Sequence, residues 1–334
     1  MLTTVPLSGT SVSAGEPIVI GLVNNMPDAA LRATGRQFRN LLTAASLNRA
    51  IHLRHFTLPG HARSPESLSY IERHCESLDK LWSGGIDGLI VTGTEPRAAT
   101  LPDEPYWREL TRLIDWTDRH AVSTIWSCLA AHAAVLHLDG IERRRLSAKL
   151  FGIYNCATID DHPVVANVPA VWWVPHSRYN GLPEELLSAR GYQVLSRSIT
   201  VGANLFIKRR TGLDVFFQGH PEYELDTLLR EYRRDVRRFL TGEISDYPVT
   251  PTDYFPPDAA DAFAVFRERA LLNRDPSLME SFPGTAIGSQ IPNSWRVAAI
   301  RVYKNWIEYL AEHKDDYPHR HHRANRKLSS PSIN

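Results

Sequence analysis

The feature that most constrains the fold of this chain is a regular alternation of apolar and helix-like segments over its first 140 residues. Residues 17–24 form a continuous apolar run, which is typical of a parallel strand covered on both faces. Residues 26–42 instead have helical spacing, with Leu31, Phe38 and Leu41 on one stripe. The alternation continues with strand patterns at 51–58, 86–93 and 122–128 and helical patterns at 64–82, 103–120 and 129–138. It predicts an α/β fold: an open, mostly parallel sheet with helices on both faces.

The remainder of the chain is less regular. Four further strand patterns lie at 171–175, 192–199, 203–209 and 213–220, and helical patterns lie at 225–240 and 295–310. Residues 1–15 are rich in Ser, Thr and Gly, and residues 315–334 are polar and basic, so we expect a disordered arm and a disordered tail. The sequence thus predicts a single domain over residues 16–314, with an insert near 262–290.

The balance of charge and the few cysteines exclude several classes of protein. There are 38 Lys and Arg against 37 Asp and Glu, so no global positive field attracts nucleic acid or an anionic membrane. Three cysteines are too few for a disulfide framework and indicate a reducing compartment. The apolar runs are too short to span a bilayer, and the first residues do not resemble a signal peptide. We expect a soluble, cytoplasmic protein with no nucleic-acid or membrane partner.

Cys128 stands where the apolar strand pattern meets the apolar helix pattern. The first amides and the dipole of a helix stabilise a thiolate at such a turn. A free cysteine is more often a small buried apolar side chain, so position alone leaves both interpretations open. Its neighbours Ser127 and Leu129 are not the glycines of a typical nucleophile elbow. Cys128 is a candidate nucleophile, whereas Cys75 and Cys156 have no comparable context.

His220 and Glu222 lie just after the strand pattern at 213–220, at the same edge of the predicted sheet as Cys128. A thiol nucleophile needs a base with a pKa near neutrality and a group that orients this base, and the pair can supply both. With 14 histidines in the chain, an ordinary surface loop is the competing interpretation.

Metal and cofactor sites are not indicated. No cysteine pair has zinc-finger spacing, there is no HExxH motif, and the dense histidines lie in the polar tail. The turn after the first strand lacks the glycines that let a backbone approach pyrophosphate. We expect neither a metal ion nor a bound cofactor.

A series of motifs in a fixed order resembles the homoserine O-acyltransferases of methionine biosynthesis. The motifs span about residues 17–312 and include IGLVNNMPDAAL, DGLIVTG, KLFGIY, PHSRY, GHPEY with EYRRDV, DYFP and SWR. This family is related to class I glutamine amidotransferases, so the resemblance implies a flavodoxin-like sheet. It also implies a homodimer as the usual state.

The resemblance implies roles for six residues. Cys128 matches the acylated nucleophile, His220 the general base and Glu222 the residue that orients the base. Three further positions match contacts to the amino-acid substrate: Lys149, Ser177 and Arg234. Without the resemblance, the lysine and arginine would be interpreted as solvated charges and the serine as a turn residue.

The acyl donor is expected to depend on the loop after the third strand. In the family, a glycine in this loop leaves room for a succinyl group, and a glutamate restricts the pocket to acetyl. Alignment without gaps between Gly93 and Tyr106 places Arg97 at this position. A guanidinium there could pair with the distal carboxylate of a succinyl group. Glu95 could instead fill the pocket.

Together with these residues, the resemblance implies acyl transfer from an acyl-coenzyme A, with succinyl favoured over acetyl, to the hydroxyl of L-homoserine. An acyl-cysteine would be the intermediate, and the acyl-coenzyme A would be a co-substrate rather than a cofactor. A homoserine O-acetyltransferase and a glutamine amidotransferase-type hydrolase are the alternatives, since the same Cys, His and Glu serve both. A binding module without activity is a third, weaker alternative.

Overall fold

The computed structural model describes residues 16–47, 49–284 and 293–315. The expected arm at 1–15, the expected tail from residue 316 onward and residues 285–290 of the expected insert lie outside the described residues. Within the described part of the chain, every helix is too short or too polar to cross a membrane.

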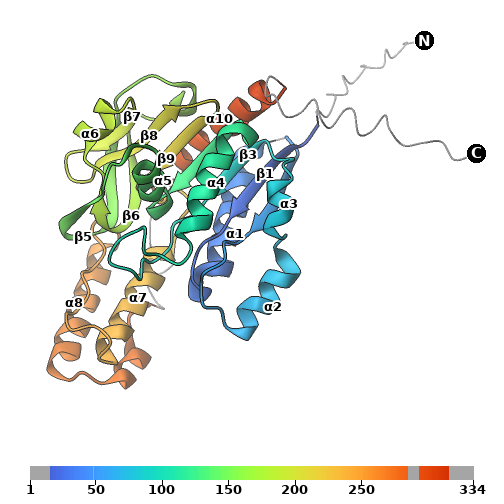
Figure 1. Ribbon diagram of the computed structural model, residues 1–334. Helices are drawn as coiled ribbons and strands as arrows, with labels where there is room; N and C mark the ends of the chain where they lie inside the picture. Colours follow the sequence, from blue (N-terminus) through green and yellow to red (C-terminus); the bar gives the residue numbers. More distant parts are fainter. Residues whose placement is uncertain (1–15, 48, 285–292, 316–334) are drawn as a thin grey trace, which may run out of the picture.

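Five parallel strands form one half of a nine-stranded sheet (Figure 1). Their order is β2-β1-β3-β4-β9, and each neighbouring pair is parallel, as the apolar runs predict. The register pairs Val91 with Trp126 and Ser127 with Phe217, so β3, β4 and β9 end at one edge. The bounds are β1 (Ile18–Val23), β2 (Ile51–Phe56), β3 (Gly88–Val91), β4 (Ser123–Ser127) and β9 (Leu213–Phe217).

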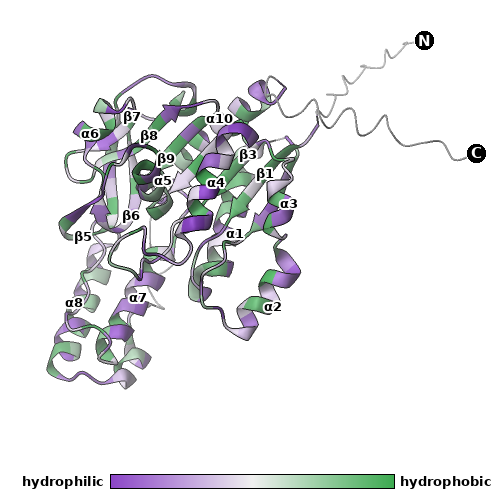
Figure 2. Cartoon of the chain, viewed as in Figure 1, coloured by the Kyte–Doolittle hydropathy of each residue, from purple (hydrophilic) through white to green (hydrophobic). Residues whose placement is uncertain are grey.

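Both faces of this parallel half are covered, because alternate residues of each strand face different cores. Ile20 packs with α1 (Asp28–Ser46) and α10 (Arg296–His313), whereas Val23 packs with α4 (Trp107–His120) and α5 (Leu129–Asp139). Both side chains are fully buried. In Figure 2, α4 carries both hydrophilic and hydrophobic residues, as expected of a helix with one face in solvent.

The other half of the sheet is antiparallel and contains a strand that the sequence pattern does not predict. The order continues β9-β8-β7-β5-β6, and these four pairs are antiparallel. The unexpected strand is β5, which has polar residues on both faces of its first half, so no alternation marks it. Pairing with β6, interrupted between Arg145 and Leu150, keeps it extended. The bounds are β5 (Arg144–Thr158), β6 (Val171–Gly181), β7 (Gln193–Ser198) and β8 (Gly202–Arg209).

The expected helix at 64–82 is wrong in one respect, because it is two helices, α2 (Pro65–His74) and α3 (Leu78–Trp82). Cys75 is extended between them. The backbone N–H of Glu76 donates to the carbonyl of His55 at 2.7 Å, and its carboxylate accepts from Arg54 at 2.8 Å. These contacts with β2 compete with continued helical bonding and end the first helix.

The helices after the sheet enclose a third core. α7 (Thr227–Leu240) and α8 (Pro257–Leu272) pack around aromatic residues, and Phe151 and Ile153 of β5 join this cluster. These helices and the 3-10 turn η2 (Pro276–Ser281) form the lower left part of Figure 1. The start of the expected insert is therefore helical and packed. Two short elements complete the described chain: η1 (Pro163–Val165) and α6 (Glu184–Ala189).

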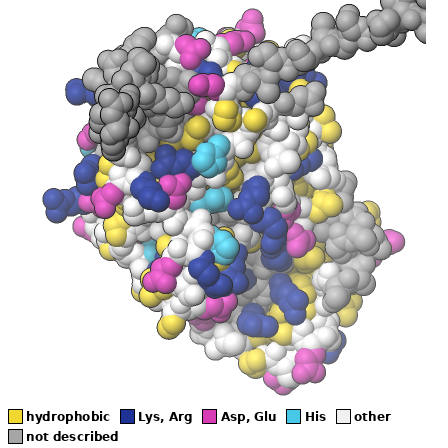
Figure 3. Space-filling model, turned by 90° about the vertical axis from the view of Figure 1, so that its right-hand side faces the viewer, with side chains coloured by type: hydrophobic (Ala, Val, Ile, Leu, Met, Phe, Trp, Pro, Cys, Tyr) yellow, Lys and Arg dark blue, Asp and Glu magenta, His cyan; other side chains and the backbone are white. Residues whose placement is uncertain are grey.

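Charge is concentrated locally even though the net charge is close to zero. Figure 3 shows Lys, Arg and His side chains gathered near the middle of one face. The near balance of positive and negative charges over the whole sequence therefore does not hold for this part of the surface.

Candidate active site

Cys128 occupies a strained turn between β4 and α5. Its backbone has φ 53° and ψ −114°. Residues with a Cβ rarely adopt this conformation, which costs on the order of 1–3 kcal/mol. The turn is fixed on both sides: the N–H of Cys128 donates to the carbonyl of Phe217 at 2.7 Å, and its carbonyl accepts from Ala131 at 3.0 Å. The half-buried thiol thus stands at the N-terminus of α5.

Gly93 allows the loop after β3 to lie against this turn. A Cβ at Gly93 would lie 2.8 Å from the backbone nitrogen of Leu129 and 3.2 Å from the carbonyl oxygen of Ser127. The tight approach is thus made by a glycine from a neighbouring strand, not by glycines beside the cysteine. This explains why the sequence around Cys128 lacks the usual elbow signature.

His220 and Glu222 lie beside Cys128, as the strand order predicts. The N–H of His220 donates to the carbonyl of Pro175 at 2.8 Å, which fixes the loop after β9 to β6. Its Nδ1 lies 2.9 Å from Oε1 of the buried Glu222, and its ring interacts electrostatically with the thiol of Cys128. Burial lowers the pKa of His220, but Cys128 and Glu222 raise it more, so it lies well above its usual value.

Two residues that the sequence reasoning did not single out extend this arrangement. The ring of Tyr223 stacks on His220 with the ring centres 4.3 Å apart. Its hydroxyl donates to one carboxylate oxygen of Glu231 at 2.5 Å, and Ser177 donates to the other at 2.6 Å. The predicted Ser177 is therefore connected to the histidine through Glu231 and Tyr223. Both lie inside the quoted GHPEY and EYRRDV motifs, so motif membership was the available signal.

Lys149 and Arg234 meet at a shared carboxylate, Asp235, which the sequence reasoning also missed. Nζ of Lys149 donates to one oxygen at 3.0 Å, and Nε of Arg234 donates to the other at 2.9 Å. The lysine is 8% exposed and lies 4.0 Å above the ring of Phe151, so its interpretation as a solvated charge is wrong. Burial raises the pKa of Asp235, but the two cations lower it more, and the net shift is downward.

The two residues expected to select the donor, Glu95 and Arg97, have different partners. Glu95 is exposed and its carboxylate pairs with Arg238 of α7 at 3.0 Å. Arg97 is exposed, and its backbone N–H donates to the buried carboxylate of Glu104 at 2.7 Å. Burial lowers the pKa of His61 to about 4, helped by the charges of nearby arginines that include Arg97.

The remaining cysteines differ from Cys128 in their surroundings. Burial raises the pKa of Cys75 to about 11 and that of Cys156 to about 12, so both remain thiols at neutral pH. All three cysteines are free. Over the part of the chain that the structure describes, no group of three or more His, Cys, Asp or Glu side chains could hold a metal ion.

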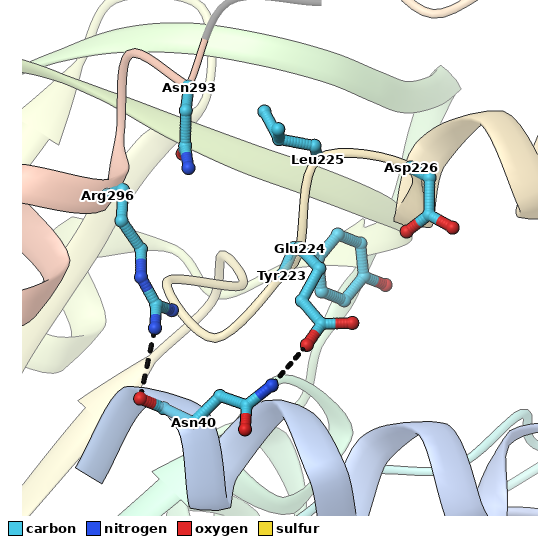
Figure 4. A pocket seen from close by; sticks show the side chains of 7 residues that line it. All are labelled: Asn40, Tyr223, Glu224, Leu225, Asp226, Asn293 and Arg296. Atoms are coloured by element: carbon cyan, nitrogen blue, oxygen red, sulfur yellow. Dashed lines mark hydrogen bonds between the residues drawn. The ribbon is translucent and has the colours of Figure 1, made fainter. Parts of the chain in front are cut away.

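A cavity of about 310 Å³ lies beside the site and shares Tyr223 with it (Figure 4). Asn40 of α1 donates to Glu224 at 2.7 Å, and Arg296 donates to the backbone carbonyl of Asn40 at 3.1 Å. These contacts connect α1, the loop after β9 and the start of α10. The other lining residues are Leu225, Asp226 and Asn293.

Comparison with known proteins decides the family. The sequence model described as "HTS: Homoserine O-succinyltransferase" matches residues 8–317. The chain belongs to the homoserine O-succinyltransferase family. A homoserine O-succinyltransferase of Rhodopseudomonas palustris is 47% identical over 90% of both chains, and one of Bradyrhizobium japonicum is 45% identical over 91% of this chain and 94% of its own. The family predicted from the order of short motifs is confirmed.

A solved structure is also similar to this member of the homoserine O-succinyltransferase family. A glutamine amidotransferase from Methylobacillus flagellatus has 16% sequence identity and a TM-score of 0.47, and the match covers 88% of this chain and 94% of that chain.

Proposed function

We propose that this protein transfers the succinyl group of succinyl-coenzyme A to the hydroxyl of L-homoserine, a step of methionine biosynthesis. Membership of the homoserine O-succinyltransferase family supports this reaction. The observation that carries it in the structure is the coupling of His220 to both Cys128 and Glu222 at the edge of the sheet, with Nδ1 of His220 2.9 Å from Glu222. This order of thiol, base and orienting carboxylate suits acyl transfer through a covalent intermediate.

In the first step, the thiolate of Cys128 attacks the thioester carbonyl of the donor. His220 takes the thiol proton, and Glu222 stabilises the resulting imidazolium. The amides of Leu129, at the start of α5, and of Gly93, which packs against it, would receive the oxyanion. The carbon–sulfur bond to coenzyme A then breaks, coenzyme A leaves with the proton from His220, and the succinyl group stays on Cys128.

In the second step, His220 accepts the proton of the homoserine hydroxyl as its oxygen attacks the acyl-cysteine. The new ester bond forms, the bond to Cys128 breaks and the thiolate returns. Arg234 and Lys149 supply cationic groups for the carboxylate of homoserine, and Ser177 supplies a hydroxyl. Asp235 and Glu231 hold these groups before the substrate arrives, which limits the entropy lost on binding.

The intermediate provides the test. Incubation of the protein with succinyl-coenzyme A and no acceptor should add one succinyl group, and peptide mass spectrometry should place it on Cys128. Addition of homoserine should remove it and yield the O-succinyl ester. Cys156→Ala is a matched control that should keep the adduct, whereas Cys128→Ala should lose it. An adduct on Cys75 or Cys156, or no adduct despite turnover, would contradict the two-step mechanism.

A parallel assay separates this function from the alternatives. Acetyl-coenzyme A should be the poorer donor by kcat/KM, and glutamine should release no ammonia. Efficient acetyl transfer would instead favour the O-acetyltransferase, and glutamine hydrolysis by the isolated chain would favour an amidotransferase.

A further inference from the structure

The four residues from His220 to Tyr223 form a tight turn that stacks two aromatic rings. The N–H of Tyr223 donates to the carbonyl of His220 at 3.2 Å, and Pro221 occupies the second position of the turn, which proline favours. The ring centres of His220 and Tyr223 therefore lie 4.3 Å apart, with 18° between the ring planes. Tyr223 is 8% exposed, so this stack forms inside the protein.

The main chain of the turn is fixed, but the main chain alone does not set the ring plane of His220. The N–H of His220 donates to Pro175 of β6 at 2.8 Å, and a Cβ at Gly219 would lie 2.5 Å from a methyl carbon of Val174. Nδ1 of the ring lies 2.9 Å from Oε1 of Glu222. A hydrogen bond at one nitrogen fixes its distance from the carboxylate but lets the ring tilt about that bond. A second contact is needed to set the plane, and the stacked ring supplies it.

Tyr223 is itself held at both ends. Its carbonyl accepts from Nε1 of the buried Trp295 at 2.8 Å, and its hydroxyl donates to Oε1 of Glu231 on α7 at 2.5 Å. Ser177 donates to the other oxygen of this carboxylate at 2.6 Å. Burial and the charge of Glu231 raise the pKa of Tyr223 well above its usual value, so its hydroxyl stays a donor at neutral pH. The ring therefore cannot shift without breaking a charge-assisted bond to α7.

We propose that Tyr223 is a positioning residue whose anchored ring sets the plane of His220 for its proton transfers. The inference rests on the proposed succinyl transfer. A general base works only when its lone pair lies within hydrogen-bond reach of the proton, and a displacement of about 1 Å can lower a rate about 100-fold. The π face of Tyr223 also favours the imidazolium that forms when His220 takes up a proton. Tyr223 thus serves both half-reactions, whereas Ser177 acts on the acceptor alone.

Acylation of Cys128 by succinyl-coenzyme A without homoserine isolates this role, because no acceptor is present. In a single turnover, the amplitude counts the competent sites and the rate constant reports how His220 is placed. Tyr223→Leu removes the stack and should lower the rate constant about 30- to 100-fold. Tyr223→Phe keeps the ring but loses its bond to Glu231, so it should recover most of the rate and lie about 3- to 10-fold below the wild type.

Steady-state kinetics separate this role from a contact to the acceptor. In a two-step reaction through an acyl-enzyme, kcat/KM for each substrate reports its own half-reaction. Tyr223→Leu should lower kcat/KM for both succinyl-coenzyme A and homoserine, and Ser177→Ala should lower it for homoserine alone. Tyr232→Phe is the matched control, because it removes the hydroxyl of a neighbouring buried tyrosine, which lies 3.4 Å from Oγ1 of Thr250. It should leave both values unchanged.

Three results would overturn the assignment. One is a wild-type rate constant of acylation in Tyr223→Leu. Another is a reduced amplitude with an unchanged rate constant, which a merely structural role would give, and the third is a loss confined to homoserine. If Tyr223→Leu does not fold, Tyr223→Phe decides, and a wild-type rate constant in that variant would overturn the assignment. A wild-type protein that succinyl-coenzyme A does not acylate would instead contradict the proposed function itself.

Discussion

At the scale of single residues, hydrogen bonds and ion pairs between neighbouring side chains fix the geometry of the site. His220 is placed by a backbone bond to β6 and a carboxylate, and the cations expected at the acceptor end share Asp235. A charge held by several partners loses little freedom when substrate binds. Substitutions that keep the charge but alter its geometry should therefore be informative.

Arg234→Lys is such a substitution. Nε and Nη2 of Arg234 lie 2.9 and 2.8 Å from one oxygen of Asp235, and the side chain is 42% exposed, so part of the guanidinium remains accessible. Lysine keeps the charge but cannot bind Asp235 and a substrate carboxylate with a planar fork. We expect KM for homoserine to rise about 10-fold while acylation of Cys128 by the donor persists. Arg233→Lys, at the adjacent exposed position, is the control, and an unchanged KM in Arg234→Lys would remove Arg234 from the site.

At the scale of elements, the site lies at one edge of the sheet. The strands β3, β4 and β9 end there, and β6 runs alongside. The parallel register brings Cys128 after β4 and the loop after β9 to one edge, and the antiparallel β6 fixes His220 from the other side. The glycine after β3 completes the arrangement by close packing against the first residue of α5.

Gly93→Ala tests this packing. The added methyl would lie 2.8 Å from the backbone nitrogen of Leu129, so either the loop or the start of α5 must move. Because oxyanion donors act only at correct distances, kcat should fall about 100-fold. The burst of acylation in rapid-quench kinetics should slow to the same extent.

The control for this variant is Gly140→Ala, at the far end of α5. Gly140 has φ +67°, and a Cβ there would meet no heavy atom within 4 Å. This variant should lose about 1 kcal/mol of stability through backbone strain and keep its kcat. Full activity in Gly93→Ala would contradict the placement of the oxyanion donors.

At the scale of the whole molecule, stability is coupled to pH through histidines that are neutral in the folded chain. Among the residues that the structure describes, five histidines have a pKa below the usual value, with burial as the largest cause: His55, His61, His132, His162 and His176. Between the folded and unfolded pKa values, the unfolded chain binds more protons. The free energy of unfolding should therefore fall as the pH is lowered from about 6.5 towards 4.

His55→Gln measures one part of this dependence. Burial, together with the charges of Arg39 and His74, lowers the pKa of His55 to about 4. Glutamine does not titrate, so the slope of stability against pH between about 4 and 6.5 should decrease by roughly 1 kcal/mol per pH unit. Denaturant titrations at several pH values give the slope. Parallel curves for the wild type and the variant would contradict this contribution.

The sequence alone determined the parallel half of the sheet and the position of Cys128, His220 and Glu222 at its edge. These features follow from local apolar periodicity and from the rule that parallel strands end together. The family also followed from the order of motifs, and the sequence match confirms it.

Tertiary structure alone decided the features that depend on contacts between distant residues. β5 is a strand because β6 pairs with it, and the helix at 64–82 divides because Glu76 binds β2. Asp235 resembles an ordinary surface charge in the sequence, yet it pairs with the buried Lys149 and the partly exposed Arg234. The physical reason is that burial and pairing are set by which side chains the fold brings together, and local periodicity carries no record of those long-range contacts.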